Sequence, residues 1–162
     1  MQTMMSQQER TSILCGDLNK VMVDKQQNKM YRWDRKVVAP HDTNLIPFNQ
    51  IEGIVEYIWK SEGLKFPPKV EELPKSMYRS IFADANRLEV RFQEHTYTKT
   101  ILHELAHSMT SDLDGESNMH GALFMGVYIH LLHRYLGLEI KHLVDTALEY
   151  GLKVNLDARP IF

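Results

Sequence analysis

The sequence predicts an α+β fold in which a small sheet packs against several helices. Three segments carry apolar residues at the spacing of one helix face: 51–58, 102–109 and 140–148. Three shorter apolar stretches, separated by Pro, Asp and Asn, are typical of strands: 70–73, 77–82 and 88–92. Because all three strands precede the second helix in the chain, we expect them to form one sheet beside it.

Length and composition describe one ordinary globular domain. The chain has 162 residues, of which 43% are hydrophobic and 25% charged, and this mixture supports a buried core without a structural metal. We expect a flexible N-terminus at 1–12, a single domain at 13–154 and a C-terminal tail at 155–162. The net charge of −2 argues against a strongly electrostatic nucleic-acid binder, so a nucleic-acid partner is left open but not favoured.

Cysteine content and hydropathy bear on the compartment. Cys15 is the only cysteine, so the chain has no internal disulfide, which favours a reducing compartment. No apolar run approaches the roughly 20 residues that span a bilayer, and the polar stretch 1–10 lacks the apolar core of a signal peptide. We therefore expect a cytoplasmic protein that does not engage a membrane.

Two segments near the N-terminus have more than one interpretation. Residues 14–22 suit either a short helix or an extended segment. The run K-M-Y-R-W-D-R-K at 29–36 interleaves basic with aromatic residues, a pattern that can bind nucleic acid. The favoured interpretation is a helix whose charged face is solvated and whose Tyr31 and Trp33 pack against the domain.

Caps and turns delimit the middle of the chain. Asn49 and Glu52 have the spacing of a capping box, so we expect a helix to begin there, and Gly63 is placed to end it. The Pro-Pro pair at 67–68 prevents its continuation. Residues 84–86, Asp-Ala-Asn, are expected to form the turn into the strand at 88–92.

The segment T-I-L-H-E-L-A-H at 100–107 contains the motif H-E-x-x-H. Residues four apart on a helix lie on the same face, so His103 and His107 can bind one Zn²⁺ through their imidazole nitrogens. Glu104, one step round the helix, is placed to accept a proton from a water molecule. Thr96 or Thr98 is expected to cap this helix at its N-terminus.

The next helix along the chain is predicted to begin at His120, after a polar loop at 111–119. Phe124, Val127 and Leu131 share a face with His120, so its ring is expected to point toward the core. His130 and His133 project from other sides, where solvated or packed histidines are the better interpretation. The last helix, at 140–148, is expected to end at Gly151.

The run L-H-E-L-A-H at 102–107, followed by H-G-A-L-F at 120–124, resembles the SprT-like minimal zinc metallopeptidases, a family of zincins. A closer likeness is to small phage and actinobacterial metallohydrolases, and it extends to Y-R-W-D-R at 31–35, V-V-A-P at 37–40 and A-N-R at 85–87. A phage protein would act in the host cytoplasm. The chain has Ala122 where the group often has Pro, and it lacks the four-cysteine zinc ribbon that many SprT-like proteins append.

The resemblance implies a minimal zincin-like fold with H-E-x-x-H on its central helix. It also implies that His103, His107 and His120 are the zinc ligands and that Glu104 is the general base. Three acidic residues also follow the motif and are the alternative third ligands: Asp112, Asp114 and Glu116. His120 is favoured over them because the helix behind it is anchored in the core, whereas a loop carboxylate must first be ordered.

The expected function is that of a zinc metallopeptidase acting on a peptide or protein. Three histidines leave the fourth zinc position to a water molecule, whose proton Glu104 accepts and delivers to the leaving amine. Two alternatives stay open: a zinc-stabilised binding or regulatory protein, and a metal-dependent hydrolase of a non-peptide bond. Tyr128 and His95 are weak candidates for stabilising the oxyanion, and the oligomeric state is left open.

Overall fold

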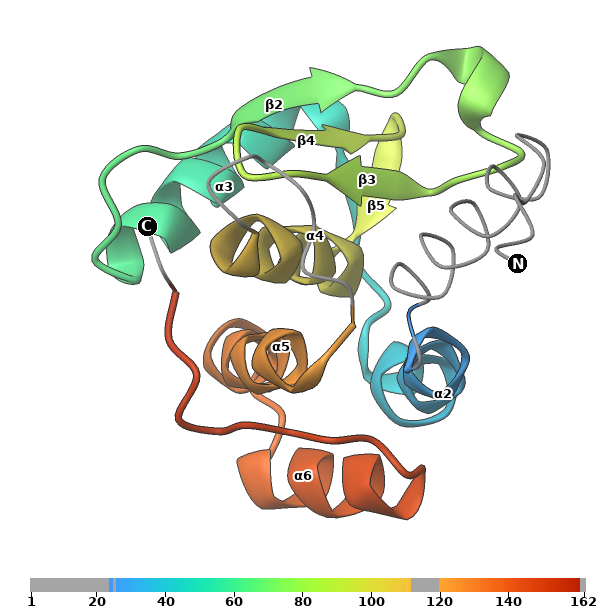
Figure 1. Cartoon of the computed structure of the whole chain (residues 1–162). Helices are drawn as coiled ribbons and strands as arrows, with labels where there is room; N and C mark the ends of the chain where they lie inside the picture. The colour runs from blue at the N-terminus through green and yellow to red at the C-terminus, as the bar shows by residue number, and fades with distance from the viewer. Residues whose placement is uncertain (1–23, 25, 112–119, 161–162) are drawn as a thin grey trace, which may run out of the picture.

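The computed structural model describes residues 24, 26–111 and 120–160, and it confirms the predicted α+β class (Figure 1). Its helices are α2 (Gln27–Trp33), α3 (Phe48–Ser61), α4 (Thr98–Thr110), α5 (Ala122–Leu136) and α6 (Ile140–Glu149). Its strands are β1 (Leu45–Pro47), β2 (Lys69–Glu72), β3 (Ala83–Ala85), β4 (Glu89–Phe92) and β5 (His95–Tyr97). Three short helical segments complete the list: η1 (Asp34–Val38), η2 (Ala39–His41) and η3 (Lys75–Met77). The N-terminus at 1–12, the segment 14–22 with Cys15, and the acidic residues 112, 114 and 116 lie outside the described residues.

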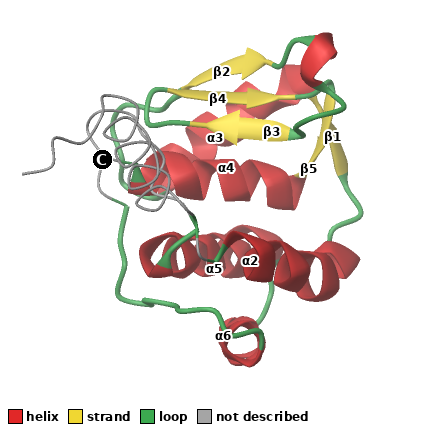
Figure 2. Ribbon diagram, turned by 45° about the vertical axis from the view of Figure 1, so that its right-hand side comes forward, coloured by secondary structure: helices red, strands yellow, loops and turns green. Residues whose placement is uncertain are grey.

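The elements stack in layers with α4 near the centre. A three-stranded sheet, in the order β2-β4-β3, lies over one side of α4, and α5 packs on the opposite side of that helix (Figures 1 and 2). Helix α6 lies beyond α5, and α2 packs beside both. Because α4 is enclosed from two sides, every residue from 101 to 110 is buried, including the polar ones. The H-E-x-x-H helix is therefore an interior element.

The prediction of a strand at 77–82 is wrong, and the third strand forms directly after these residues. Residues 75–77 make a short helical turn, and β3 occupies 83–85, where a turn was expected. Pairing with β4 selects this strand, because Ala83 lies opposite Phe92 and Ala85 opposite Val90. The turn itself is held by Asn86, whose side-chain oxygen accepts the backbone N–H groups of the next residues, 88 and 89, at 2.8 Å each.

Both predicted helix caps are also wrong, for one shared reason. Strands β1 and β5 pair antiparallel, and each runs directly into a helix, α3 after Pro47 and α4 after Tyr97. Neither helix has a side-chain cap at its N-cap residue, so the expected box of Asn49 and Glu52 does not form. Instead, Asp42 accepts the Lys99 backbone N–H at 2.6 Å, in the first turn of α4.

Helix α2 agrees in part with the interpretation of a solvated helix. Met30 and Trp33 are fully buried, and the Trp33 indole donates a hydrogen bond to the Thr146 hydroxyl of α6 at 3.0 Å. The basic side chains of this segment are exposed, as expected: Lys29, Arg32, Arg35 and Lys36. Tyr31 differs from the expectation, because 40% of its surface remains exposed.

The C-terminal segment runs along α5. The backbone N–H of Asn155 donates to the carbonyl oxygen of Ala122 at 3.0 Å, close to the start of that helix. Gly126 permits this approach, since a methyl group there would lie 1.8 Å from the Asn155 carbonyl oxygen. Among the described residues, no helix combines the length and the apolar character needed to cross a bilayer.

Candidate metal centre

Three imidazoles from two parts of the chain meet at one point. His103 and His107 stand one turn apart on α4, and His120 lies in the turn that leads into α5, two residues before the helix begins. The Nε2 atoms of the three rings are 3.1 Å apart in every pairing. All three residues are buried, with 6–7% of their surface exposed. The structure thus brings together the three histidines that the resemblance implied as ligands.

This triangle fits a transition-metal ion. Nitrogen ligands of a tetrahedral zinc ion, each 2.0–2.1 Å from the metal, lie about 3.3 Å from one another. Burial lowers the pKa of all three imidazoles, that of His107 to about 3, so each ring is held in the neutral form that binds metals. Three neutral nitrogens converging at 3.1 Å in a buried site suit a shared cation, and imidazole sets suit zinc among other metals.

Asp24 and Gln26 hold His120 in place from the start of α2. The Asp24 carboxylate accepts the backbone N–H of His120 at 3.0 Å and also the ring Nδ1–H. This pairing puts the ring proton on Nδ1 and leaves the Nε2 lone pair facing the other histidines. Burial alone would raise the pKa of Asp24, but the hydrogen bonds from the ring and backbone of His120 outweigh it and lower that pKa. Gln26 donates its amide N–H to the His120 carbonyl at 2.7 Å.

Nothing in the sequence pointed to Asp24. It lies 96 residues from His120, within a segment that carries no recognisable motif. Only the packing of α2 beside the turn at 120–121 brings the two residues into contact.

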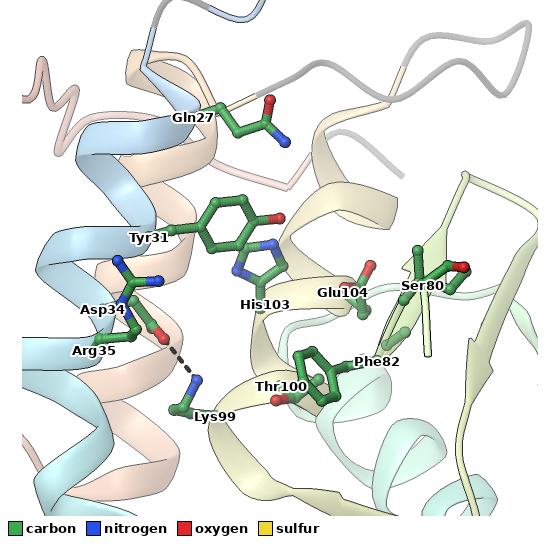
Figure 3. Close-up of a pocket in the computed structure, with 12 residues that line it drawn as sticks. Gln27, Tyr31, Asp34, Arg35, Ser80, Phe82, Lys99, Thr100, His103 and Glu104 are labelled. Carbon is green, nitrogen blue, oxygen red and sulfur yellow. Dashed lines mark hydrogen bonds and ion pairs between the residues drawn. The ribbon is translucent and has the colours of Figure 1, made fainter. Parts of the chain in front are cut away.

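Glu104 lies at the floor of a pocket of about 450 Å³ that also exposes His103 (Figure 3). The carboxyl group is buried, and this burial, with a smaller contribution from Asp84, raises its pKa to about 8. Within the described part of the chain, no side chain or backbone group hydrogen-bonds this carboxyl group. A cation at the three imidazoles would favour the ionised form and lower this pKa.

The pocket has two walls, one on each side of α4. One wall is the face of α2 and η1 formed by Gln27, Tyr31, Asp34 and Arg35. The other is the segment 80–83, which leads into β3 and presents Phe82, 79% exposed, at the rim (Figure 3). A cleft with an apolar rim on one side and polar side chains on the other suits a chain-like organic substrate.

Tyr128 and His95, the two candidates for oxyanion stabilisation, do not line this pocket. Tyr128 is fully buried, and its hydroxyl donates to Asp34 at 2.6 Å. Burial, followed by the charge of Asp34, raises the pKa of this phenol well above its ordinary value. The second oxygen of Asp34 pairs with the Lys99 ammonium at 2.6 Å. Tyr128 therefore supports the wall of the pocket, and His95 lies exposed on β5.

The remaining histidines of α5 behave as expected. The His130 ring bonds to the carbonyl oxygen of Leu156 at 2.8 Å, and the His133 ring to that of Leu138 at 2.7 Å. Both contacts fasten backbone segments to α5 and leave these rings away from the triangle.

Tyr31 is a second residue of this site that the sequence did not indicate. Its ring is stacked against His103, with 6.0 Å between centroids, and meets His120 edge-on at 5.2 Å. The motif Y-R-W-D-R did single out this segment, but it carried no indication that Tyr31 would reach the histidines.

Compared with protein-family models, curated proteins and solved structures, the chain matches none of them. The likeness to SprT-like peptidases therefore stays an expectation, and only the geometry of the site bears on function.

Proposed function

We propose that this protein is a zinc-dependent metallohydrolase with a minimal zincin-like arrangement, and that it cleaves peptide bonds. One observation carries the proposal: the triangle of His103, His107 and His120 nitrogens lies beside Glu104, and His103 and Glu104 open into the same pocket. A metal site and a carboxyl group that share access to a substrate-sized cleft are the parts that hydrolysis requires.

Each residue of the site has a separate role in the proposed hydrolysis. The three imidazoles would hold the metal, and Asp24 orients one of them. A zinc ion bound there supplies Lewis acidity, which makes water a better nucleophile and polarises the substrate carbonyl. Glu104 accepts the proton of the attacking water and passes it to the leaving amine. Its buried position keeps this carboxylate free of competing hydrogen bonds from the described residues.

The sheet supports a peptide as the substrate. Strand β3 pairs with β4 on one side and with no other described strand, and Ala83 of this strand lines the pocket. An extended peptide can pair its backbone with such an edge. Phe82 at the rim would then contact an apolar side chain, and Arg35 on the facing wall an acidic or carboxyl-terminal group.

A purely structural zinc site is the alternative, and Glu104 argues against it. Structural zinc is usually enclosed by four protein ligands, whereas the described residues supply three that converge. A structural site also has no use for a buried carboxyl group whose pKa is raised to about 8. The pocket beside the metal would serve no purpose in such a site.

The test compares wild-type protein with Glu104→Gln, both loaded with zinc, on a peptide library derived from a proteome digest. We expect the wild type to cleave a subset of peptides and the Gln variant to be at least 10³-fold slower, because an amide cannot accept the proton. Zinc content and thermal unfolding of both proteins control for loss of metal or fold. Equal cleavage by the two proteins would remove Glu104 from the mechanism, and no cleavage by either would favour the zinc-stabilised binding protein.

A further inference from the structure

The side chain of Tyr31 reaches from α2 over the metal centre. Apart from His103 itself, it is the residue lining the pocket whose ring contacts two of the three histidines, with centroid distances of 6.0 Å to His103 and 5.2 Å to His120. Figure 3 shows the phenol crossing in front of the His103 ring, with its hydroxyl pointing toward the side of the pocket where Glu104 lies. The two side chains thus approach the same space, Tyr31 from one wall of the pocket and Glu104 from its floor.

The fold holds this ring in position. Met30 and Trp33 anchor α2 in the core, and the indole of Trp33 is fastened to Thr146 on α6. Tyr31, between them in sequence, is thereby turned to the opposite face, which is the one that lines the pocket. Little further ordering of the side chain is needed when a substrate arrives.

The hydroxyl proton of Tyr31 is available to a ligand. Burial, followed by the charge of Glu104, raises the pKa of the Tyr31 phenol, so the hydroxyl keeps its proton. The Gln27 amide nitrogen lies on the side of this hydroxyl (Figure 3). A neutral phenol can donate its own O–H even where its oxygen accepts a bond from a neighbouring amide.

The other donors of the pocket are less suited to the same task. The Lys99 ammonium is paired with Asp34 at 2.6 Å. The Arg35 side chain is exposed on the outer part of the wall, and Ser80 lies on the opposite wall. Among the described residues, neither of these two side chains contacts the three histidines, whereas the Tyr31 ring packs against two of them.

We infer that Tyr31 is a catalytic residue whose hydroxyl donates a hydrogen bond to the substrate carbonyl oxygen as that oxygen gains negative charge. The inference rests on the proposed hydrolysis. Glu104 accepts the proton of water on one side of the reacting carbon, and Tyr31 stabilises the oxyanion on another. No covalent bond to the protein forms, and the phenol keeps its proton throughout. Removing one such donor typically slows an enzyme about 10²–10³-fold.

The test is Tyr31→Phe, which keeps the ring against both histidines and removes only the hydroxyl. Tyr57→Phe is the matched control, because Tyr57 is 67% exposed on α3 and does not line the pocket. With a peptide that the wild type cleaves, we expect Tyr31→Phe to lower kcat about 10²-fold with KM within about threefold, since the bond forms in the transition state. Zinc affinity, measured by competition with a chromophoric chelator, should stay within about twofold in both variants.

A second measurement does not depend on turnover. Acetohydroxamate binds metal through oxygens that stand in for the substrate carbonyl, and its Kd can be read from the visible spectrum of the cobalt-substituted protein. We expect Tyr31→Phe to bind acetohydroxamate about tenfold more weakly than wild type and Tyr57→Phe to bind it equally well.

The outcomes separate this inference from the proposed function. If wild type cleaves and Glu104→Gln does not, but Tyr31→Phe cleaves within threefold of wild type, the function stands and the role of Tyr31 is refuted. Loss of zinc by Tyr31→Phe also overturns it, since the hydroxyl would then act on the ligands. If no protein cleaves any peptide, the hydroxamate titration decides alone, and an unchanged Kd rejects the hydrogen bond.

Discussion

The Asp24 carboxylate accepts hydrogen bonds from both the backbone N–H and the ring Nδ1 of His120. One acidic residue thereby sets the position, the rotation and the tautomer of an imidazole 96 residues away. His120 is the one histidine of the triangle that does not lie on α4, so it gains most from a separate orienting group.

Asp24→Ala is expected to weaken zinc affinity 10–100-fold, because the freed ring can rotate and its tautomer is no longer set. Competition with a chromophoric chelator measures the change. Asp145→Ala is the matched control, since Asp145 lies exposed on α6 and pairs only with Lys141 in the described structure. An Asp24 variant that binds zinc as tightly as this control would show that the carboxylate does not support the metal site.

The protein is expected to bind about one zinc ion per chain and to release it at acid pH, where protons compete for the imidazoles. His120→Ala should lower zinc affinity far more than alanine at any of the alternative carboxylate ligands: Asp112, Asp114 and Glu116. Elemental analysis gives the stoichiometry, and chelator competition ranks the variants. Retention of zinc by His120→Ala, with loss in one acidic variant, would reassign the third ligand.

Glu104 should make the stability of the metal-free protein depend on pH. Its pKa is about 8 when folded against an ordinary 4.5, so between these values the folded state holds a proton that the unfolded state has released. The stability from this group is therefore fully present below pH 4.5 and is lost as the pH rises to about 8. The total is on the order of a few kcal/mol.

Glu104→Gln removes this titration and isolates its effect. With a chelator present to remove metal, we expect the free energy of unfolding of the Gln variant to exceed that of wild type by a few kcal/mol at pH 9. This difference should vanish near pH 4.5. The histidines titrate in both proteins, so their effect cancels in the comparison. Urea unfolding at pH 5, 7 and 9 measures the difference, and a difference that does not change with pH would show that the carboxyl group has no raised pKa.

Two glycines in helices should respond oppositely to alanine. At Gly126 of α5 the new methyl group would lie 1.8 Å from the Asn155 carbonyl oxygen, so Gly126→Ala should destabilise the protein by about 3 kcal/mol or more. At Gly53 of α3 nothing lies within 4 Å, and alanine should stabilise the helix by up to about 1 kcal/mol. Urea unfolding of both variants checks this pair. Equal stability of Gly126→Ala and wild type would mean that the C-terminal segment does not pack on α5.

Features that depend on neighbouring residues could be predicted from the sequence. The spacing of H-E-x-x-H puts His103 and His107 on one helix face whatever surrounds them, and the structure has their Nε2 atoms 3.1 Å apart. The apolar stripes likewise predicted α3, α4 and α6, since burying one face is a property of each helix by itself. Gly63 and Gly151 take up positive φ just after α3 and α6, as expected of residues that end helices.

Features that depend on distant residues were decided only by the tertiary structure. Strand β3 forms because β4 offers it a partner, although residues 77–82 have the stronger apolar pattern. Asp42 caps α4 across 57 residues, which no local spacing can indicate. The candidate site divides in the same way. The placement of the α4 histidines and Glu104 follows from helix geometry. The contact with His120, the support from Asp24 and the placement of Tyr31 arise only when α2 and α5 pack beside α4. Burial in a shared core, and not chain connectivity, holds these residues together.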